Sequence, residues 1–126
     1  LGKGPQKVFD TAQAVTEGLE AVLQTIGPGV RTGDVHQAWQ DVLNRYGLTK
    51  ESRIGYSIGV GYSPDWGEHT VSLRANEQTI LEQNMTLHVM LGMWMDGWGI
   101  EFSETVAVTE SGCESLTKFD REVISV

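Results

Sequence analysis

The spacing of apolar residues divides the chain into two parts with different periodicities. Over residues 7–26, apolar side chains recur every three or four positions, which places them on one face of an α-helix. They are Val8, Ala12, Val15, Leu19, Val22, Leu23 and Ile26. The segment Gly27-Pro28-Gly29 predicts the end of this helix.

A second amphipathic helix is predicted over residues 33–46. Its apolar face consists of Val35, Ala38, Trp39, Val42, Leu43 and Tyr46. Thr32 is a suitable N-cap, Asp34 lies in the first turn, where the helix dipole favours negative charge, and Gly47 suits the C-terminal cap. The first part of the chain is therefore predicted to be two helices joined by a short loop.

After Arg53 the pattern changes to a period of two, which is typical of strands. Residues 85–91 and 98–109 predict two strands, and residues 110–112 predict a tight turn after the second. In the first strand Met85, Leu87, Val89 and Leu91 alternate with Thr86, His88 and Met90. We therefore predict an α+β fold, with two amphipathic helices packed on a curved antiparallel sheet.

Composition restricts the class of protein. The 126 residues suit one domain, and 9 Lys/Arg against 17 Asp/Glu give a net charge of −8, which disfavours a nucleic-acid partner. Cys113 is the only cysteine, so no disulfide framework forms, and no apolar run is long enough for a membrane span. We expect a cytoplasmic protein without a membrane partner. Because Leu1 stands where an initiator methionine is expected, we also expect a fragment or a processed product.

The order of these segments resembles the second half of the pita-bread fold, which creatinase, prolidase, aminopeptidase P and methionine aminopeptidase share. The matching stretches are Gly-Tyr-Ser-Ile-Gly at 55–59, Ile-Leu-Glu-Gln-Asn-Met at 80–85 and Phe-Ser-Glu-Thr-Val at 102–106. This resemblance implies that residues 1–126 form the C-terminal half of a creatinase/aminopeptidase-like catalytic domain. The first half and the N-terminal domain of the family would then be absent.

The chain departs from the family at three metal-ligand positions, where the resemblance places Tyr56, Met90 and Ser103. A phenol, a thioether and a hydroxyl do not replace the imidazole and carboxylate ligands of the metallopeptidases, so we expect no metal, and no other cofactor is indicated. The phrase from Gly55 to Thr70 is most similar to the ectoine hydrolases, which open the cyclic amidine of ectoine. The resemblance thus implies a fragment of a metal-independent hydrolase of a small zwitterionic or cationic solute such as ectoine, inactive by itself.

His88 and Glu101 are the candidate catalytic residues. Strand alternation places His88 on the face of Met90, and Glu101 on the face of Ser103, so both would line the cavity of the family. Histidine titrates near neutral pH, and a carboxylate can hold a cationic amidine or move its proton. The alternative is a hydrogen-bonded strand histidine and a solvated strand glutamate.

Candidate substrate-binding residues surround these two. They are Tyr56, Tyr62, His69, Met90, Trp94, Trp98 and Ser103. The tyrosines alternatively anchor the sheet, His69 alternatively lies in a surface loop, and the tryptophans alternatively belong to the core or an interface. We predict that Tyr56, His88, Met90, Glu101 and Ser103 converge on one concave surface, closed by Trp94 or Trp98.

Two other functions stay open at this point. A non-catalytic half-domain would act as a binding or self-associating module, forming a homodimer or pairing with the missing first half, because an isolated half exposes the apolar surface that its sister covers. A metallopeptidase-like protein is the more distant alternative.

Overall fold

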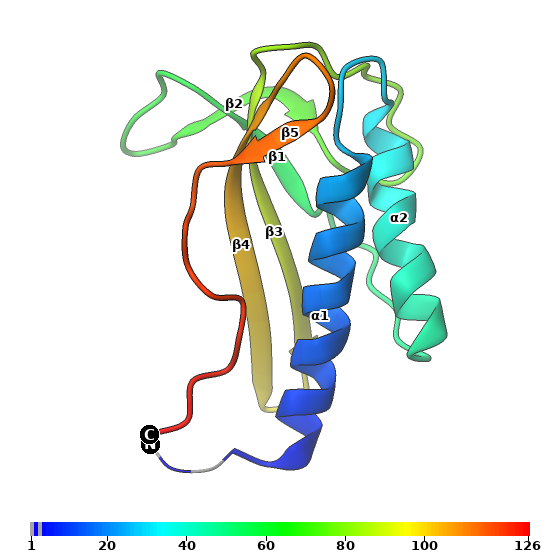
Figure 1. Cartoon of the computed structure of the whole chain (residues 1–126), viewed down its shortest axis with the longest axis vertical. Helices are drawn as coiled ribbons and strands as arrows, with labels where there is room; N and C mark the ends of the chain where they lie inside the picture. The colour runs from blue at the N-terminus through cyan, green and yellow to red at the C-terminus, as the bar shows by residue number, and fades with distance from the viewer. Residues whose placement is uncertain (1, 3) are drawn as a thin grey trace.

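The two amphipathic segments form helices close to their predicted bounds. The computed structural model describes residues 2 and 4–126, and in it α1 spans Gln6–Thr25 and α2 spans Thr32–Arg45. Both helices lie side by side on one side of the sheet (Figure 1). Neither described helix has the length and apolar character needed to cross a membrane.

The start of α2 differs from the prediction. Arg31, with an extended backbone, occupies the N-cap position, and Thr32 is the first residue of the helix. The backbone N–H of Thr32 donates to the carbonyl of Thr79 at 2.9 Å, and that of Gly33 donates to the carbonyl of Glu77 at 3.0 Å. The prediction of Thr32 as N-cap is therefore wrong, because a distant loop supplies the acceptors that a capping side chain usually supplies.

Five antiparallel strands form one sheet in the order β2-β1-β3-β4-β5. Their bounds are Gly55–Ile58 for β1, Gly67–Ser72 for β2, Thr86–Met95 for β3, Trp98–Val108 for β4 and Cys113–Ser115 for β5. The long hairpin of β3 and β4 is the centre of the sheet (Figure 1). β3 continues four residues beyond its predicted end at Leu91.

The core lies between the helices and the sheet. Along β3 and β4 alternate side chains point to the helices and are buried: Leu87, Val89, Leu91, Met93, Val106 and Val108. Gly18 of α1 permits the close approach of α2, because a Cβ atom at this position would lie 2.1 Å from the ring of Trp39. The fold prediction of two helices on an antiparallel sheet is confirmed.

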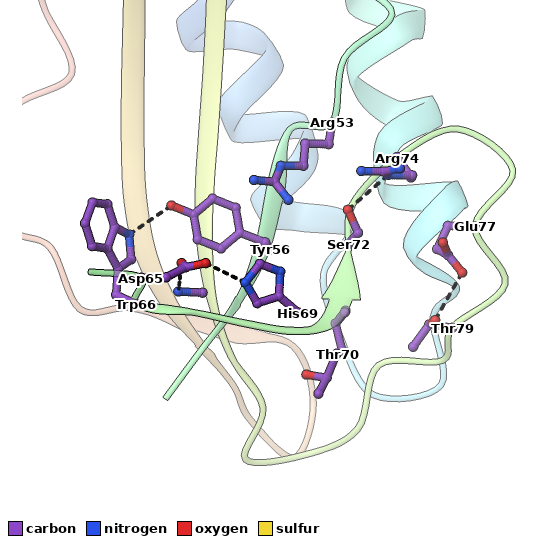
Figure 2. Close-up of a pocket in the computed structure, with 12 residues that line it drawn as sticks. Arg53, Tyr56, Asp65, Trp66, His69, Thr70, Ser72, Arg74, Glu77 and Thr79 are labelled. Atoms are coloured by element: carbon purple, nitrogen blue, oxygen red, sulfur yellow. Dashed lines mark hydrogen bonds and ion pairs between the residues drawn. The ribbon is translucent and has the colours of Figure 1, made fainter. Parts of the chain in front are cut away.

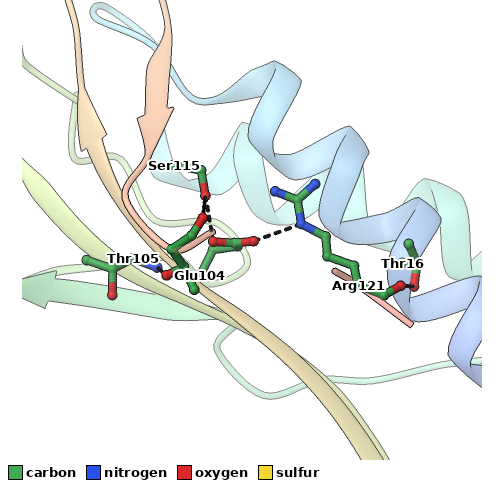
Figure 3. A network of polar contacts seen from close by, with 6 residues as sticks. Thr16, Glu104, Thr105, Ser115 and Arg121 are labelled. Atoms are coloured by element: carbon green, nitrogen blue, oxygen red, sulfur yellow. Dashed lines mark hydrogen bonds and ion pairs between the residues drawn. The ribbon is translucent and has the colours of Figure 1, made fainter. Parts of the chain in front are cut away.

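A buried carboxylate joins the end of the chain to the sheet. Glu104 of β4 is only 2% exposed and lies on the helix-facing side among apolar residues. Its carboxylate accepts hydrogen bonds from Arg121 Nε at 2.8 Å and from Ser115 Oγ at 2.5 Å (Figure 3). Thr16 Oγ1 of α1 donates to the backbone carbonyl of Arg121 at 3.4 Å, so the C-terminal segment contacts both the sheet and α1.

Candidate functional site

The strand register brings five sequence-predicted site residues to one face of the sheet. Tyr56 pairs with His88, Met90 pairs with Ser103, and Gly92 pairs with Glu101. Residues directly opposite in an antiparallel ladder project to the same side, and this side is opposite to the one that packs on the helices. We call the surface formed by Tyr56, His88, Met90, Glu101 and Ser103 the open face.

Tyr56 and His88 are in direct contact on the open face. Their ring centroids are 5.3 Å apart, with the ring planes tilted by 51°. Burial lowers the pKa of His88 below its ordinary value of 6.5, and the negative charge of Glu101 opposes this shift. At neutral pH the imidazole is therefore mostly uncharged, which allows one ring nitrogen to accept a proton.

Lys50, which the sequence analysis did not single out, lies near Glu101. The ammonium of Lys50 donates to the carbonyl of Gly92 at 2.6 Å and lies 5.1 Å from the ring centroid of Trp94. Burial lowers the pKa of Lys50, while Glu101 raises it. A Cβ atom at Gly92 would lie 3.2 Å from both Glu101 Cβ and Trp94 Cζ2, so these side chains crowd one small area of the open face.

The two candidate tryptophans lie on opposite faces of the sheet. Trp94 pairs with Gly99, and its indole lies over the open face, where a Cβ atom at Gly99 would be 2.5 Å from Trp94 Cε3. Trp98 pairs with Met95 on the helix-facing side, where the Lys7 ammonium lies 5.3 Å from its ring centroid. Only Trp94 is therefore placed beside the other predicted site residues.

A cavity of about 470 Å³ adjoins the open face at Tyr56 (Figure 2). It lies beside β1 and β2, and its polar lining comes from the residues labelled in Figure 2. They are Arg53, Tyr56, Asp65, Trp66, His69, Thr70, Ser72, Arg74, Glu77 and Thr79. The indole N–H of Trp66 donates to the phenol oxygen of Tyr56 at 3.1 Å, which fixes the hydroxyl at the edge of the cavity.

An irregularity in β2 shapes one wall of this cavity. Tyr56 pairs with Ser72 while Ile58 pairs with Gly67, so β2 carries three more residues than β1 between these pairs. Within the extra segment His69 adopts φ +55°, in the left-handed region that non-glycine residues rarely occupy. Such bulges turn a side chain in a new direction, and they are frequent beside functional sites.

His69 forms a close pair with Asp65. The two side chains are joined at 2.5 Å between His69 Nε2 and Asp65 Oδ2, and Asp65 Oδ1 accepts from the backbone N–H of Gly67 at 3.0 Å. The pKa of Asp65 is lowered, mainly by the hydrogen bond from the Gly67 backbone and then by the contact with His69. The carboxylate of Asp65 is therefore engaged by neighbouring residues of its own loop.

The remaining predicted residue, Tyr62, is exposed in the loop between β1 and β2 and does not line the cavity. Sequence reasoning missed Arg53, Arg74 and Lys50, because they come from three loops that only the fold brings near the strands. Arg53 lies two residues before Gly55, the first residue of the Gly-Tyr-Ser-Ile-Gly phrase, and this closeness was the one available signal. The functional roles of all these residues stay predictions.

The described residues do not form a cluster of side chains that could bind a metal ion. Within residues 2 and 4–126, no group of three or more histidine, cysteine, aspartate or glutamate side chains lies close enough to hold an ion. The open face instead presents the phenol of Tyr56, the thioether of Met90 and the hydroxyl of Ser103, at the positions where the sequence resemblance places metal ligands of the family. This donor set does not fit the divalent metal of a metallopeptidase.

Comparison with known proteins agrees with this architecture. The model of the metallopeptidase family M24 matches residues 1–110. The ectoine hydrolase of Halomonas elongata is 44% identical over 124 residues, which cover 98% of this chain and 31% of that protein. The predicted resemblance to the pita-bread proteins, and to ectoine hydrolase among them, is confirmed.

Solved structures give the same result for the fold. The dipeptidase PepE of Mycobacterium ulcerans superposes with a TM-score of 0.89 at 26% identity, covering 98% of this chain and 33% of that chain. An X-Pro aminopeptidase of Thermotoga maritima has a TM-score of 0.89 at 23% identity, covering 100% and 35%, and shows the fold alone. The chain thus spans about a third of the length of these proteins.

Proposed function

This chain belongs to the metallopeptidase family M24, and we propose that it forms the C-terminal half of the catalytic domain of a metal-independent hydrolase that opens the cyclic amidine of ectoine or a similar solute. The observation that carries the proposal is the open face. Tyr56, Met90 and Ser103 occupy the positions where the resemblance places metal ligands of the family. Tyr56 pairs with His88, and the Met90–Ser103 pair lies between His88 and Glu101, the two residues with proton-transfer chemistry. The substrate is therefore a small organic molecule held by side chains.

Three of the open-face residues have roles that follow from their positions. Glu101 supplies the negative charge that holds a cationic amidinium, and the uncharged imidazole of His88 accepts or donates a hydrogen bond beside it. Tyr56 is held by Trp66 and offers its own hydroxyl hydrogen to the substrate. Trp94 forms an aromatic wall at the far end. The base that activates water for attack on the amidine carbon comes from the first half, so the 126-residue chain alone does not turn over ectoine.

A chimeric enzyme tests this function. The part of Halomonas elongata ectoine hydrolase that matches this chain is replaced by the 126 residues, and ectoine hydrolysis is measured beside the parent enzyme. We expect hydrolysis by the chimera and none by the isolated chain. A folded chimera without ectoine hydrolysis contradicts the proposal, and cleavage of an Xaa-Pro dipeptide with added Mn²⁺ would establish the metallopeptidase alternative instead.

A self-associating half-domain is the second candidate, and exposed apolar side chains favour it. Val60, Tyr62 and Trp66 project from the β1–β2 loop, with Val60 99% exposed, and Trp94 is exposed on the open face. Such side chains are usually covered by another surface. Light scattering on the purified chain distinguishes the two functions, because a monomer at high concentration contradicts self-association and leaves the hydrolase proposal unaffected.

A further inference from the structure

Arg53 and Arg74 stand apart from the other arginines of the chain. Arg31, Arg45 and Arg121 each pair with a carboxylate, whereas the described part of the chain contains no ion pair of the remaining two. This is unexpected in a protein with 17 acidic and 9 basic residues, where carboxylate partners are abundant. Both arginines line the same cavity beside Tyr56.

The contacts of both arginines leave most of their donors available. Arg53 Cζ lies 4.7 Å from the ring centroid of Tyr56, a stacking contact that uses the face of the guanidinium rather than its N–H groups. Arg74 uses its Nε to donate to Ser72 Oγ at 3.1 Å, which leaves both terminal nitrogens. In the view of Figure 2 the Arg53 guanidinium lies between the Tyr56 ring and the Arg74 guanidinium.

The two carboxylates that also line the cavity are engaged elsewhere. Asp65 accepts from His69 and from the Gly67 backbone, although Arg53 contributes weakly to its lowered pKa. Glu77 accepts from Thr79 Oγ1 and from the backbone N–H of Gln78, both at 3.2 Å. The cavity therefore presents unpaired guanidinium groups beside acids that already have partners.

We propose that Arg53 and Arg74 bind the carboxylate of the substrate in this cavity, while the rest of the substrate lies over Tyr56 and His88. A guanidinium matches a planar carboxylate with two parallel hydrogen bonds. The volume of about 470 Å³ is in the range of small-molecule sites. The inference rests on the proposed function, and it defines the substrate class as small amidines or amides that carry a carboxylate.

Binding to the isolated chain tests the carboxylate site without any need for catalysis. The ¹⁵N-labelled protein is titrated with ectoine, and separately with the same methylated tetrahydropyrimidine ring lacking its carboxylate. We expect ectoine to shift the side-chain Nε–Hε signals of Arg53 and Arg74, and to bind about tenfold or more tightly than the analogue, which corresponds to about 1.4 kcal/mol. Equal affinity for the two ligands, or no shift with ectoine, overturns the proposal.

Substitutions assign the effect to the two arginines. Arg53→Gln and Arg74→Gln should each weaken ectoine binding about tenfold and leave binding of the analogue unchanged, while Arg45→Gln on the outer surface of α2 serves as the matched control. Unchanged ectoine binding in both variants overturns the proposal. If a variant fails to fold, the comparison of ectoine with the analogue on the wild-type chain still tests the carboxylate site.

The outcomes for this site and for the proposed function are separable. Arginine-dependent binding of ectoine with an inactive, folded chimera contradicts the proposed hydrolase and supports the carboxylate site. An active chimera whose KM for ectoine is unchanged by Arg53→Gln and Arg74→Gln supports the hydrolase and overturns the carboxylate site.

Discussion

Tyr56 and His88 are directly paired across β1 and β3, with their ring centroids 5.3 Å apart on the open face. The pairing places a phenol hydroxyl and an uncharged imidazole within reach of one small molecule. It also fixes His88 by its backbone register rather than by a flexible loop, which is the kind of positioning that proton transfer requires.

In the active chimera, His88→Gln should lower kcat by a factor of about 10² or more, because general acid–base groups contribute on this scale. His36→Gln is the matched control, since His36 lies buried in α2, on the other side of the sheet. Steady-state kinetics check this, and a His88→Gln variant with kcat within twofold of the parent chimera would show that His88 has no role in the reaction.

Stability should fall in mildly acidic solution. Burial lowers the pKa of both His36 and His88 in the folded chain below the ordinary 6.5. The unfolded chain therefore binds more protons as the pH falls through 6.5, and the free energy of unfolding decreases until the pH passes the folded pKa values. Urea unfolding from about pH 7.5 to about pH 5.5 measures this slope.

The double variant His36→Gln/His88→Gln provides the control for this pH effect. Its unfolding free energy should vary less between the same two pH values, even if it is lower throughout. An unchanged slope would assign the acid sensitivity to carboxylates instead.

The two helices, both faces of β3 and the α+β class could be predicted from the sequence because each depends on local periodicity. The cap of α2 could not, because its acceptors come from the distant residues Glu77 and Thr79. β2 was not predicted for a similar reason. Its regular alternation is interrupted at His69, and its pairing with β1 depends on a three-residue irregularity that no period in the sequence records.

The candidate site was predictable to the same extent. Alternation alone places His88 with Met90 and Glu101 with Ser103, since each pair shares a strand. Arg53 and Arg74 converge only through tertiary structure, so the cavity had no sequence signal. Cys113 shows another effect of tertiary structure: burial raises the pKa of its thiol, and its Sγ donates to the carbonyl of Leu23 at 3.2 Å.

Breaking the Glu104–Arg121 ion pair should lower the free energy of unfolding substantially. Arg121→Met leaves a carboxylate that is 2% exposed without its counter-ion, and removing one member of a buried pair typically costs about 3 kcal/mol of unfolding free energy. Arg45→Met is the control, because Arg45 is exposed and lies 3.8 Å from Glu17, where such a pair contributes less than about 1 kcal/mol. Urea unfolding compares the two, and equal effects would contradict the structural role of Arg121.

The double variant Glu104→Leu/Arg121→Met refines this test. Replacing both charges by apolar groups should recover most of the stability lost in Arg121→Met, since the unpaired charge rather than the lost contact carries the cost. A double variant less stable than Arg121→Met would instead assign a net stabilising value to the pair.

Gly18→Ala should separate the two helices. A Cβ atom 2.1 Å from the Trp39 ring cannot be accommodated without moving α2, and we expect a loss of about 3 kcal/mol despite the better helix propensity of alanine. Gly112→Ala is the matched control, because a Cβ atom at Gly112 would have the carbonyl oxygen of Ile26, 4.0 Å away, as its nearest neighbour. Thermal unfolding by circular dichroism gives both values, and similar melting temperatures would contradict the close packing of α1 on α2.

The irregular register of β2 also affects how the molecule behaves among its own copies. β2 forms one edge of the sheet, and an edge strand with regularly spaced free N–H and carbonyl groups is a template on which another chain can add a strand. The three additional residues and the left-handed backbone at His69 interrupt that spacing. The same distortion that forms a cavity wall therefore protects this edge against aggregation through strand addition.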